Sequence, residues 1–151
     1  MLYTIGEMAK ELGIHASTLR YYDKEGLLPF VERSSGGIRM FTEEDFATLK
    51  LINCLKRSGL SIKEIKSYIK MSAEGDRSLK ERQELFENRR KAVKQQMAEL
   101  AETLEVLNYK CWYYETAVNA GSEQAVKGLS KAELPRQFQK AKAKLEITEK
   151  K

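Results

Sequence analysis

Arg20, Tyr21 and Lys24 lie between two residues that typically delimit helices, Ser17 and Gly26. The Ser17 hydroxyl can accept from a free backbone N–H at a helix start, and Gly26 tolerates the left-handed conformation that ends a helix. Arg20 and Lys24 are four residues apart and therefore share a helix face. A short helix that offers Arg, Lys and Tyr fits the DNA major groove. The alternative is an ordinary amphipathic surface helix.

A second short helix is predicted immediately upstream, over residues 4–12. Thr4 and Glu7 have the spacing of a capping box, in which each side chain bonds the other residue's backbone N–H. Apolar residues follow at helical spacing, and Gly13 ends the helix. Two short helices joined by a few residues that include glycine form a helix-turn-helix layout. We expect Leu19 and Tyr22 to anchor the second helix to a core shared with the first.

Residues 27–41 predict a small two-stranded hairpin. Extended stretches flank the turn cluster Ser34-Ser35-Gly36-Gly37, and each stretch contains one arginine, Arg33 or Arg39. We expect both arginines to point outward, where a hairpin beside a helix-turn-helix can contact phosphates and position the domain. The residues expected to pack inward are Val31, Ile38 and either Met40 or Phe41.

Two further helices complete a predicted N-terminal domain over residues 1–71. Thr42 and the acids after it open a helix that ends near Ser58, and Ser61 with Glu64 forms a capping box that opens another, ending near Met71. Lys63 lies off the apolar face of the last helix, and it either contacts backbone phosphate or belongs to a solvated surface. Residues 72–77 are polar and form a predicted linker.

A long helix is predicted over residues 78–120, because no glycine or proline interrupts this stretch. Its apolar residues alternate at spacings of three and four, the pattern of a coiled-coil seam. A lone helix cannot bury this stripe against so small a domain, so a second copy of the chain is the simplest partner. The expected dimer interface consists of Phe86, Val93, Met97, Leu100, Leu104, Leu107, Cys111 and Tyr114.

The end of the long helix carries four aromatic residues, and residues 121–151 form a short tail. The aromatic residues spread around the whole helix, so some must pack against an element other than a partner helix, and the N-terminal domain of either subunit is available. The tail is rich in lysine and contains a weak helical pattern from Arg136 to Leu145. The aromatic residues are Tyr109, Trp112, Tyr113 and Tyr114.

The composition excludes several classes of protein. With 42% hydrophobic and 32% charged residues, the chain is too apolar for full disorder and suits long, solvated helices. Residues 1–78 hold 12 basic and 11 acidic side chains, so DNA binding there would depend on placed side chains rather than on bulk charge. The chain has no membrane-spanning apolar run and no signal-peptide pattern, so we expect a cytoplasmic protein that does not contact a membrane.

In these combined features the chain resembles the MerR family of transcriptional regulators. The resemblance implies a mainly α fold, in which a winged helix-turn-helix DNA-binding domain precedes a long dimerisation helix that forms an antiparallel coiled coil. It also implies a homodimer on a pseudo-palindromic, long-spacer promoter in double-stranded DNA. Distortion of the spacer would act on RNA polymerase indirectly at the promoter. The matching stretches are Thr4-Ile5-Gly6-Glu7, Thr18 to Leu27, Arg33 with Gly36 to Phe41, and Gly59 to Ile65.

By position, the resemblance assigns recognition-helix contacts to Arg20, Tyr21 and Tyr22, and wing contacts to Arg33 and Arg39. The full expected set of DNA-binding residues is Ser17, Thr18, Arg20, Tyr21, Tyr22, Lys24, Arg33, Arg39 and Lys63.

The cysteines separate the branches of this family. Metal-sensing members carry further Cys or His after the long helix, but none follows Cys111 here and the sole histidine is His15, so we expect no metal and no cofactor. The tail is too short for a separate effector domain. What remains is the short-tailed branch that responds to aldehydes and related electrophiles, in which a lone cysteine at the position of Cys54 is the proposed sensor. Lys50 and Arg57 can favour the Cys54 thiolate, although a small core cysteine is the alternative.

Three kinds of function remain from the sequence. The main one is a dimeric transcription factor that responds to an electrophile through Cys54. A second is a regulator that holds a small organic inducer at the Trp112–Tyr114 cluster. A third is a coiled-coil adaptor that does not bind DNA, although an adaptor would not require Arg20 together with the hairpin arginines. No enzyme is expected, because the sequence has no His-based triad, phosphate loop or recognisable carboxylate pair.

Overall fold

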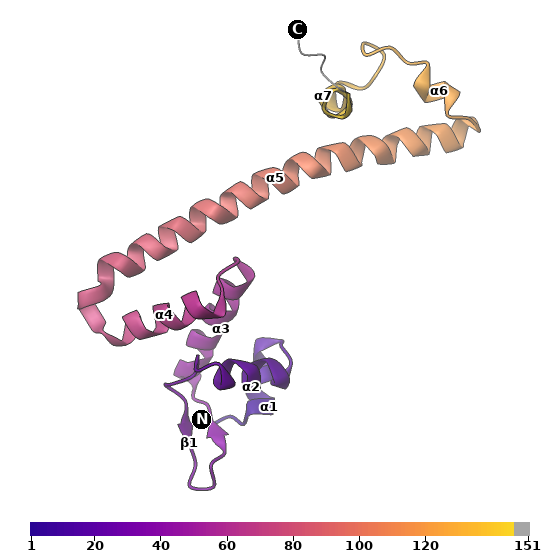
Figure 1. Cartoon of the computed structure of the whole chain (residues 1–151). Coiled ribbons are helices and arrows are strands. Elements are labelled where there is room, and N and C mark those ends of the chain that lie inside the picture. The colour runs from indigo at the N-terminus through magenta and orange to yellow at the C-terminus, as the bar shows by residue number, and fades with distance from the viewer. Residues whose placement is uncertain (147–151) are drawn as a thin grey trace. The chain divides into compact units, whose positions relative to one another are not determined.

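Helices make up most of residues 1–146, the part of the chain that this computed structural model describes (Figure 1). The chain divides into two compact units, the first covering Met1–Arg90 and the second beginning at Lys91. The expected fold class is confirmed: a helix-turn-helix domain precedes one long helix. Within the described residues, no helix is both long and apolar enough to cross a lipid bilayer.

The first two helices form the predicted helix-turn-helix. Helix α1 (Ile5–Leu12) begins with the expected capping box of Thr4 and Glu7 and ends at Gly13, whose φ of 67° lies in the left-handed region. Helix α2 (Ala16–Lys24) follows after a short connection. It begins earlier than predicted, because His15 rather than Ser17 is its N-cap residue, and no side chain caps it. Ser17 therefore lies inside the first turn of α2.

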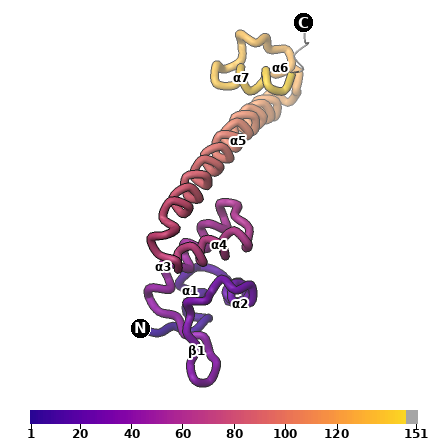
Figure 2. The backbone as a smooth tube through the Cα atoms, turned by 60° about the vertical axis from the view of Figure 1, so that its left-hand side comes forward, coloured from indigo at the N-terminus to yellow at the C-terminus, as the bar shows by residue number. Residues whose placement is uncertain are grey.

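Strands β1 (Glu32–Arg33) and β2 (Arg39–Met40) form the predicted hairpin, which projects from the body of α1–α4 (Figures 1 and 2). The strands are antiparallel, and Arg33 lies opposite Arg39. Tyr3 extends the sheet through two backbone hydrogen bonds with Phe41, at 2.8 and 2.9 Å. This pairing fixes the base of the hairpin to the N-terminus of the chain.

Helices α3 (Glu43–Arg57) and α4 (Ile62–Ala73) begin with the predicted caps, Thr42 and Ser61. A 3-10 turn, η1 (Gly75–Ser78), follows α4 directly, so the stretch predicted as a linker is mostly helical. The buried Ser78 hydroxyl donates to the carbonyl oxygens of Met71 and Gly75. Arg82 donates from Nε to Ser78 Oγ at 3.0 Å and from Nη2 to the Gly75 carbonyl at 2.7 Å. These bonds fasten the end of α4 to the start of the next helix.

The core of the first unit is built mainly from aliphatic side chains of α1–α4 and the residues around the hairpin. Phe41 at the end of the hairpin is fully buried, and Leu85 from the following helix packs on the same cluster, which explains why this unit extends to Arg90. Phe86 also meets Tyr68 edge-on, with 5.3 Å between ring centroids. The largest fully buried side chains are Phe41, Met8, Leu19, Leu27, Leu49, Ile52 and Ile65.

Helix α5 (Leu79–Ala120) is the predicted long helix, and Gly121, in the left-handed region, follows it. Helices α6 (Gln124–Lys127) and α7 (Arg136–Leu145) lie beside its C-terminal end (Figures 1 and 2). Helix α7 has the bounds that the sequence pattern predicted. Its Lys144 bonds Glu105 of α5 at 3.1 Å and lies 3.8 Å from Glu102.

The aromatic end of α5 packs against the C-terminal helices of its own chain. Tyr109 and Tyr113 are buried with Phe138 and Ala141 of α7, and Trp112 stacks on Phe138 at 5.3 Å between centroids. The expectation that some of these aromatic residues pack against an element other than a partner helix is therefore confirmed, and the packing element is α7 instead of the N-terminal domain that the sequence left available. The tail helix α7, whose helical pattern in the sequence is weak, has an apolar face that packs against the aromatic residues.

Candidate nucleic-acid interface

Helix α2 has one face in the core and one face in solvent. Leu19 is fully buried and only 4% of Tyr22 is exposed, so this side anchors the helix. Arg20, Tyr21 and Lys24 are exposed, and 47% of Tyr21 is accessible. The same helix face therefore presents a guanidinium, a phenol and an ammonium group, the donors that suit base edges and phosphates.

Tyr22 does not belong with the exposed group. Its side chain is an anchor of the core, and burial raises the pKa of its phenol, with Tyr21 adding to the effect. The expectation that Tyr22 contacts DNA is therefore corrected to a packing role. Ser17 is exposed and Thr18 is half-buried at the N-terminal end of α2, and Lys63 is exposed on the first turn of α4.

The C-terminal end of α2 depends on Gly26. Its φ of 77° is left-handed, and the next residue, Leu27, donates its backbone N–H to the Tyr22 carbonyl at 2.9 Å. A Cβ at Gly26 would lie 3.1 Å from Nζ of Lys66 on α4. Lys66, which our DNA-binding set does not include, therefore lies beside the end of α2.

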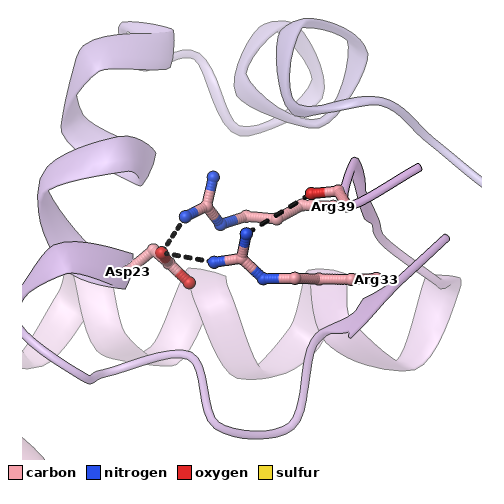
Figure 3. A network of polar contacts seen from close by, with 4 residues as sticks. Asp23, Arg33 and Arg39 are labelled. Carbon is pink, nitrogen blue, oxygen red and sulfur yellow. Dashed lines mark hydrogen bonds and ion pairs between the residues drawn. The ribbon is translucent and has the colours of Figure 1, made fainter. Parts of the chain in front are cut away.

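The two hairpin arginines face α2. Asp23 Oδ2 accepts hydrogen bonds from Nη2 of Arg39 and, at 3.3 Å, from Nη2 of Arg33 (Figure 3). Arg33 also donates from Nη1 to the Gly37 carbonyl at 3.3 Å. The expectation that both arginines simply point outward is corrected, because an acid on the neighbouring helix attracts them.

Asp23 has electrostatic properties that match this position. The hydrogen bond from Arg39 lowers the pKa of Asp23 below its ordinary value, the charges of Arg39 and Arg33 contribute to the same shift, and partial burial opposes it. Exposed fractions of the side chains are 18% for Asp23, 24% for Arg39 and 53% for Arg33. All three groups therefore remain partly accessible at the surface.

Sequence reasoning did not identify Asp23 as a functional residue. The available signal was an acid in a helix whose neighbours are Arg20, Tyr21 and Lys24.

The hairpin also differs from expectation at Ile38, whose side chain is 62% exposed rather than packed inward. Phe41, one of the two alternatives expected to pack inward, is fully buried. The reason is that Ile38 follows the turn directly, whereas Phe41 pairs with Tyr3.

The residues proposed for dimerisation and sensing are spread over α5 and α3. Most seam side chains are exposed, whereas Val93 is half-buried and 37% of Phe86 is accessible. Cys54 on α3 and Cys111 on α5 are both exposed free thiols. No group of three or more His, Cys, Asp or Glu side chains in residues 1–146 is placed to hold a metal ion. The exposed seam residues are Met97, Leu100, Leu104, Leu107, Cys111 and Tyr114.

Known families match the chain over most of its first 109 residues. The MerR HTH family regulatory protein model matches residues 3–72, and the model named MerR, DNA binding matches residues 46–109. An uncharacterised HTH-type transcriptional regulator of Haemophilus influenzae is 48% identical over 126 residues, which cover 83% of this chain and 93% of that protein. The HTH-type transcriptional regulator AdhR of Bacillus subtilis is 38% identical over 89 residues, or 59% of this chain and 64% of AdhR.

Solved structures of MerR family regulators are also similar to this chain. The crystal structure of HiNmlR, described as a MerR family regulator lacking the sensor domain and bound to promoter DNA, has a TM-score of 0.81 and 46% identity, covering 89% of this chain and all of that one. A MerR family regulator of Bacillus thuringiensis has a TM-score of 0.69 and 39% identity, covering 74% of this chain and 97% of that one.

These similarities confirm the expected family and its short-tailed branch, and they set aside the interpretation as an adaptor without DNA binding. The exposed face of α2, the hairpin beside it and the matches over residues 3–109 lead to the same conclusion. The chain is a DNA-binding transcriptional regulator and belongs to the MerR family.

Proposed function

We propose that the protein binds a pseudo-palindromic promoter as a homodimer and modulates transcription by distorting the spacer between the half-sites. The observation that carries this proposal is the shared surface of α2 and the hairpin, in a chain 46% identical to a regulator whose crystal structure is described as bound to promoter DNA. RNA polymerase responds to the changed spacer rather than to a direct contact. Because promoters lie in the bacterial cytoplasm, the protein works there.

The contacts divide according to the groups that α2 and its neighbours expose. Arg20 and Tyr21 reach base edges from the exposed face of α2, because a guanidinium can bond two acceptors of a guanine at once. Arg33 and Arg39 of the hairpin contact phosphates and set the position of the domain. The remaining polar residues also contact the DNA backbone, and they are Ser17, Thr18, Lys24 and Lys63.

Dimerisation follows from the seam of α5. A row of large apolar side chains remains more than half exposed in a single chain, which is the pattern that a second helix covers. An antiparallel arrangement places one DNA-binding domain at each end of the pair. Two linked domains can then hold two half-sites and supply the few kcal/mol, roughly, that distortion of the intervening DNA requires.

The test uses a duplex from the DNA upstream of the gene, chosen to carry a pseudo-palindromic dyad, and a random duplex of equal length. Arg20→Ala is expected to weaken cognate binding by about 1–3 kcal/mol more than random binding, because it removes a base contact. Lys10→Ala, an exposed basic residue of α1 outside the proposed surface, serves as the control. Equal losses on both duplexes would show that Arg20 contacts phosphate only. Absence of sub-micromolar cognate binding at moderate salt would overturn the DNA-binding assignment.

The inducer of this regulator is an aldehyde or related electrophile that reacts with Cys54. Two observations support this part of the proposal: the Cys54 thiol is exposed on α3, and the chain is similar to AdhR and HiNmlR. A thiolate at this place can attack an electrophilic carbon, which would alter α3 within the DNA-binding domain. The aromatic end of α5 is less suited to hold an inducer, because Phe138 of α7 already stacks there.

Cys54→Ser tests the sensor, and Cys111→Ser makes the same conservative change at the other thiol, which lies in the α5 seam and is exposed in a single chain. The first variant is expected to lose the transcriptional response to an electrophile and to keep its DNA affinity, and the second to keep both. An unchanged response in Cys54→Ser overturns the thiol mechanism. If only Cys111→Ser loses the response, the sensor lies on α5 instead.

A further inference from the structure

We propose that Asp23 is a specificity-determining residue, which neutralises part of the charge of Arg33 and Arg39 and fixes both arginines beside α2. This inference rests on the wing contacts proposed above. Its basis is the shared acceptor: one carboxylate oxygen, Oδ2 of Asp23, serves both guanidinium groups (Figure 3).

The hairpin alone would be an unfavourable arrangement of charge. Arg33 and Arg39 lie directly opposite each other in the ladder, and like charges at such positions repel. Asp23 provides the compensating negative charge, so the three side chains together carry one positive charge instead of two. The hairpin therefore keeps donors that can bind phosphate but loses part of its unselective attraction to DNA.

The second effect of Asp23 is positional. Arg33 is held at two points, by Asp23 Oδ2 at 3.3 Å and by the Gly37 carbonyl at 3.3 Å, and Arg39 is held by the same carboxylate. Asp23 lies three residues after Arg20 on α2. The phosphate-binding groups of the hairpin are therefore fixed relative to the helix that reads bases, and their ordering does not have to occur on binding.

These two effects give opposite predictions for cognate and random DNA. Without the carboxylate charge, the arginines become free cations, which strengthens binding to any duplex. The same loss releases the arginines from α2. This weakens binding to the cognate site, because only there do base contacts of α2 and phosphate contacts of the hairpin have to form together. Asp23 therefore raises the ratio of cognate to random affinity, the quantity on which promoter selection depends.

The experiment measures the affinity of the full-length protein for the upstream dyad duplex and for a random duplex over a range of salt concentrations. In Asp23→Asn, which keeps the side-chain size, random binding is expected to tighten by about fivefold. Its salt slope should steepen by about one per DNA-binding domain, since one more phosphate is neutralised. The cognate affinity should gain less or fall, so that the ratio drops. The same change in an Arg33→Ala/Arg39→Ala background should leave the ratio unaltered.

Asp23→Glu separates charge from position, because it keeps the negative charge and displaces the carboxylate. It is expected to retain the wild-type salt slope and to lose part of the cognate affinity. A wild-type ratio in this variant would overturn the positional effect. Far-ultraviolet circular dichroism checks that both variants fold, which we expect because Asp23, Arg33 and Arg39 are all partly exposed.

The outcomes distinguish this inference from the proposed function. If Arg33→Ala and Arg39→Ala leave both affinities unchanged, the wing contacts themselves are wrong. If those variants weaken binding but Asp23→Asn changes neither the ratio nor the slope, only the role of Asp23 is overturned. If the ratio falls equally in the Arg33→Ala/Arg39→Ala background, Asp23 acts through another group and the inference also fails.

Discussion

The core of residues 1–90 consists mainly of aliphatic side chains, whereas the core at the C-terminal end of α5 is built around a cluster of aromatic side chains. The first core is complete within one chain. In the same unit, Asp23 of α2 pairs with both arginines of the hairpin. The second unit closes its aromatic cluster with α7 but leaves the α5 seam uncovered.

The two units therefore differ in how much apolar surface they leave for a partner molecule. The first unit buries the side chains of its core within one chain, so this core needs no partner molecule to complete it. The second unit leaves large side chains such as Met97 and Leu100 about two-thirds exposed, and burying their apolar surface against a partner would be favourable. The predictions below test how far each unit depends on partners outside it, from the largest expected effect to the smallest.

Leu104→Lys should separate the proposed dimer into monomers. Leu104 lies in the seam and is 56% exposed in a single chain, and the substitution places a charge at both copies of the position in a dimer. Loss of about 2 kcal/mol of burial in each copy weakens association by about a thousandfold. Sedimentation equilibrium measures the association, and binding to a two-half-site duplex should fall with it.

Ala98→Lys is the matched control, because Ala98 is exposed and lies off the seam. It introduces the same side chain and should leave association unchanged. Equal mass distributions for Leu104→Lys and the parent protein would contradict the seam as the dimer interface.

Phe138→Ala should release α7 from α5 and leave the first unit folded. The side chain is buried against Tyr109 and Trp112, and truncation of a buried phenylalanine costs about 3–5 kcal/mol. Hydrogen exchange of the α7 amides should accelerate, whereas that of α3 should not. Lys140→Ala on the exposed side of α7 is the control. Retained protection of α7 in the Phe138 variant would show that the aromatic cluster does not hold the helix.

Ser61→Ala should destabilise the first unit by about 1 kcal/mol, the usual effect of removing a helix cap. Ser61 Oγ accepts from the Glu64 backbone N–H at 3.2 Å, and the Glu64 carboxylate accepts from the Ser61 backbone N–H at 2.7 Å. Chemical denaturation measures the loss. Ser67→Ala, at an exposed position of the same helix, should have a much smaller effect. Similar losses for the two variants would remove the capping box as the cause.

The smallest effect concerns pH and the second unit. Tyr113 donates a hydrogen bond to Glu123 at 2.8 Å, and this bond raises the pKa of Tyr113 to about 12. Because this pKa lies above the ordinary value of 10.0 and the acceptor of the bond is the ionised Glu123 carboxylate, the stabilisation is fully present between neutral pH and pH 10 and is lost as the pH rises through about 12. In an ultraviolet absorbance titration, Tyr113→Phe should lack the tyrosine ionisation that occurs at the highest pH in the parent protein. A titration curve that loses an earlier transition would contradict the assignment.

The sequence predicted those parts of the fold that depend on local chemistry. The predicted caps Thr4, Thr42 and Ser61, together with the glycine at the end of α1, mark helix boundaries through contacts between near neighbours. The start of α2 was placed wrongly, because His15 adopts the cap conformation without a side-chain bond to reveal it.

Contacts between distant residues were not predictable in the same way. Asp23 meets Arg39 across 16 positions of the chain, and Tyr109 meets Phe138 across 29, so neither contact leaves a local pattern. Within the candidate site, the exposure of Arg20, Tyr21 and Lys24 followed from helical spacing. The direction of the hairpin arginines did not, because it depends on an acid in another element.

The middle of α5 has an evolutionary consequence. Residues 94–105 are all exposed, so this stretch lies in neither of the two cores. Seven extra residues here would lengthen the helix by about 10 Å and return the seam to nearly the same face. In the proposed dimer, the length of α5 therefore sets the distance between the two DNA-binding domains. Insertion or deletion of heptads can change this distance while both cores and the DNA-reading residues stay as they are.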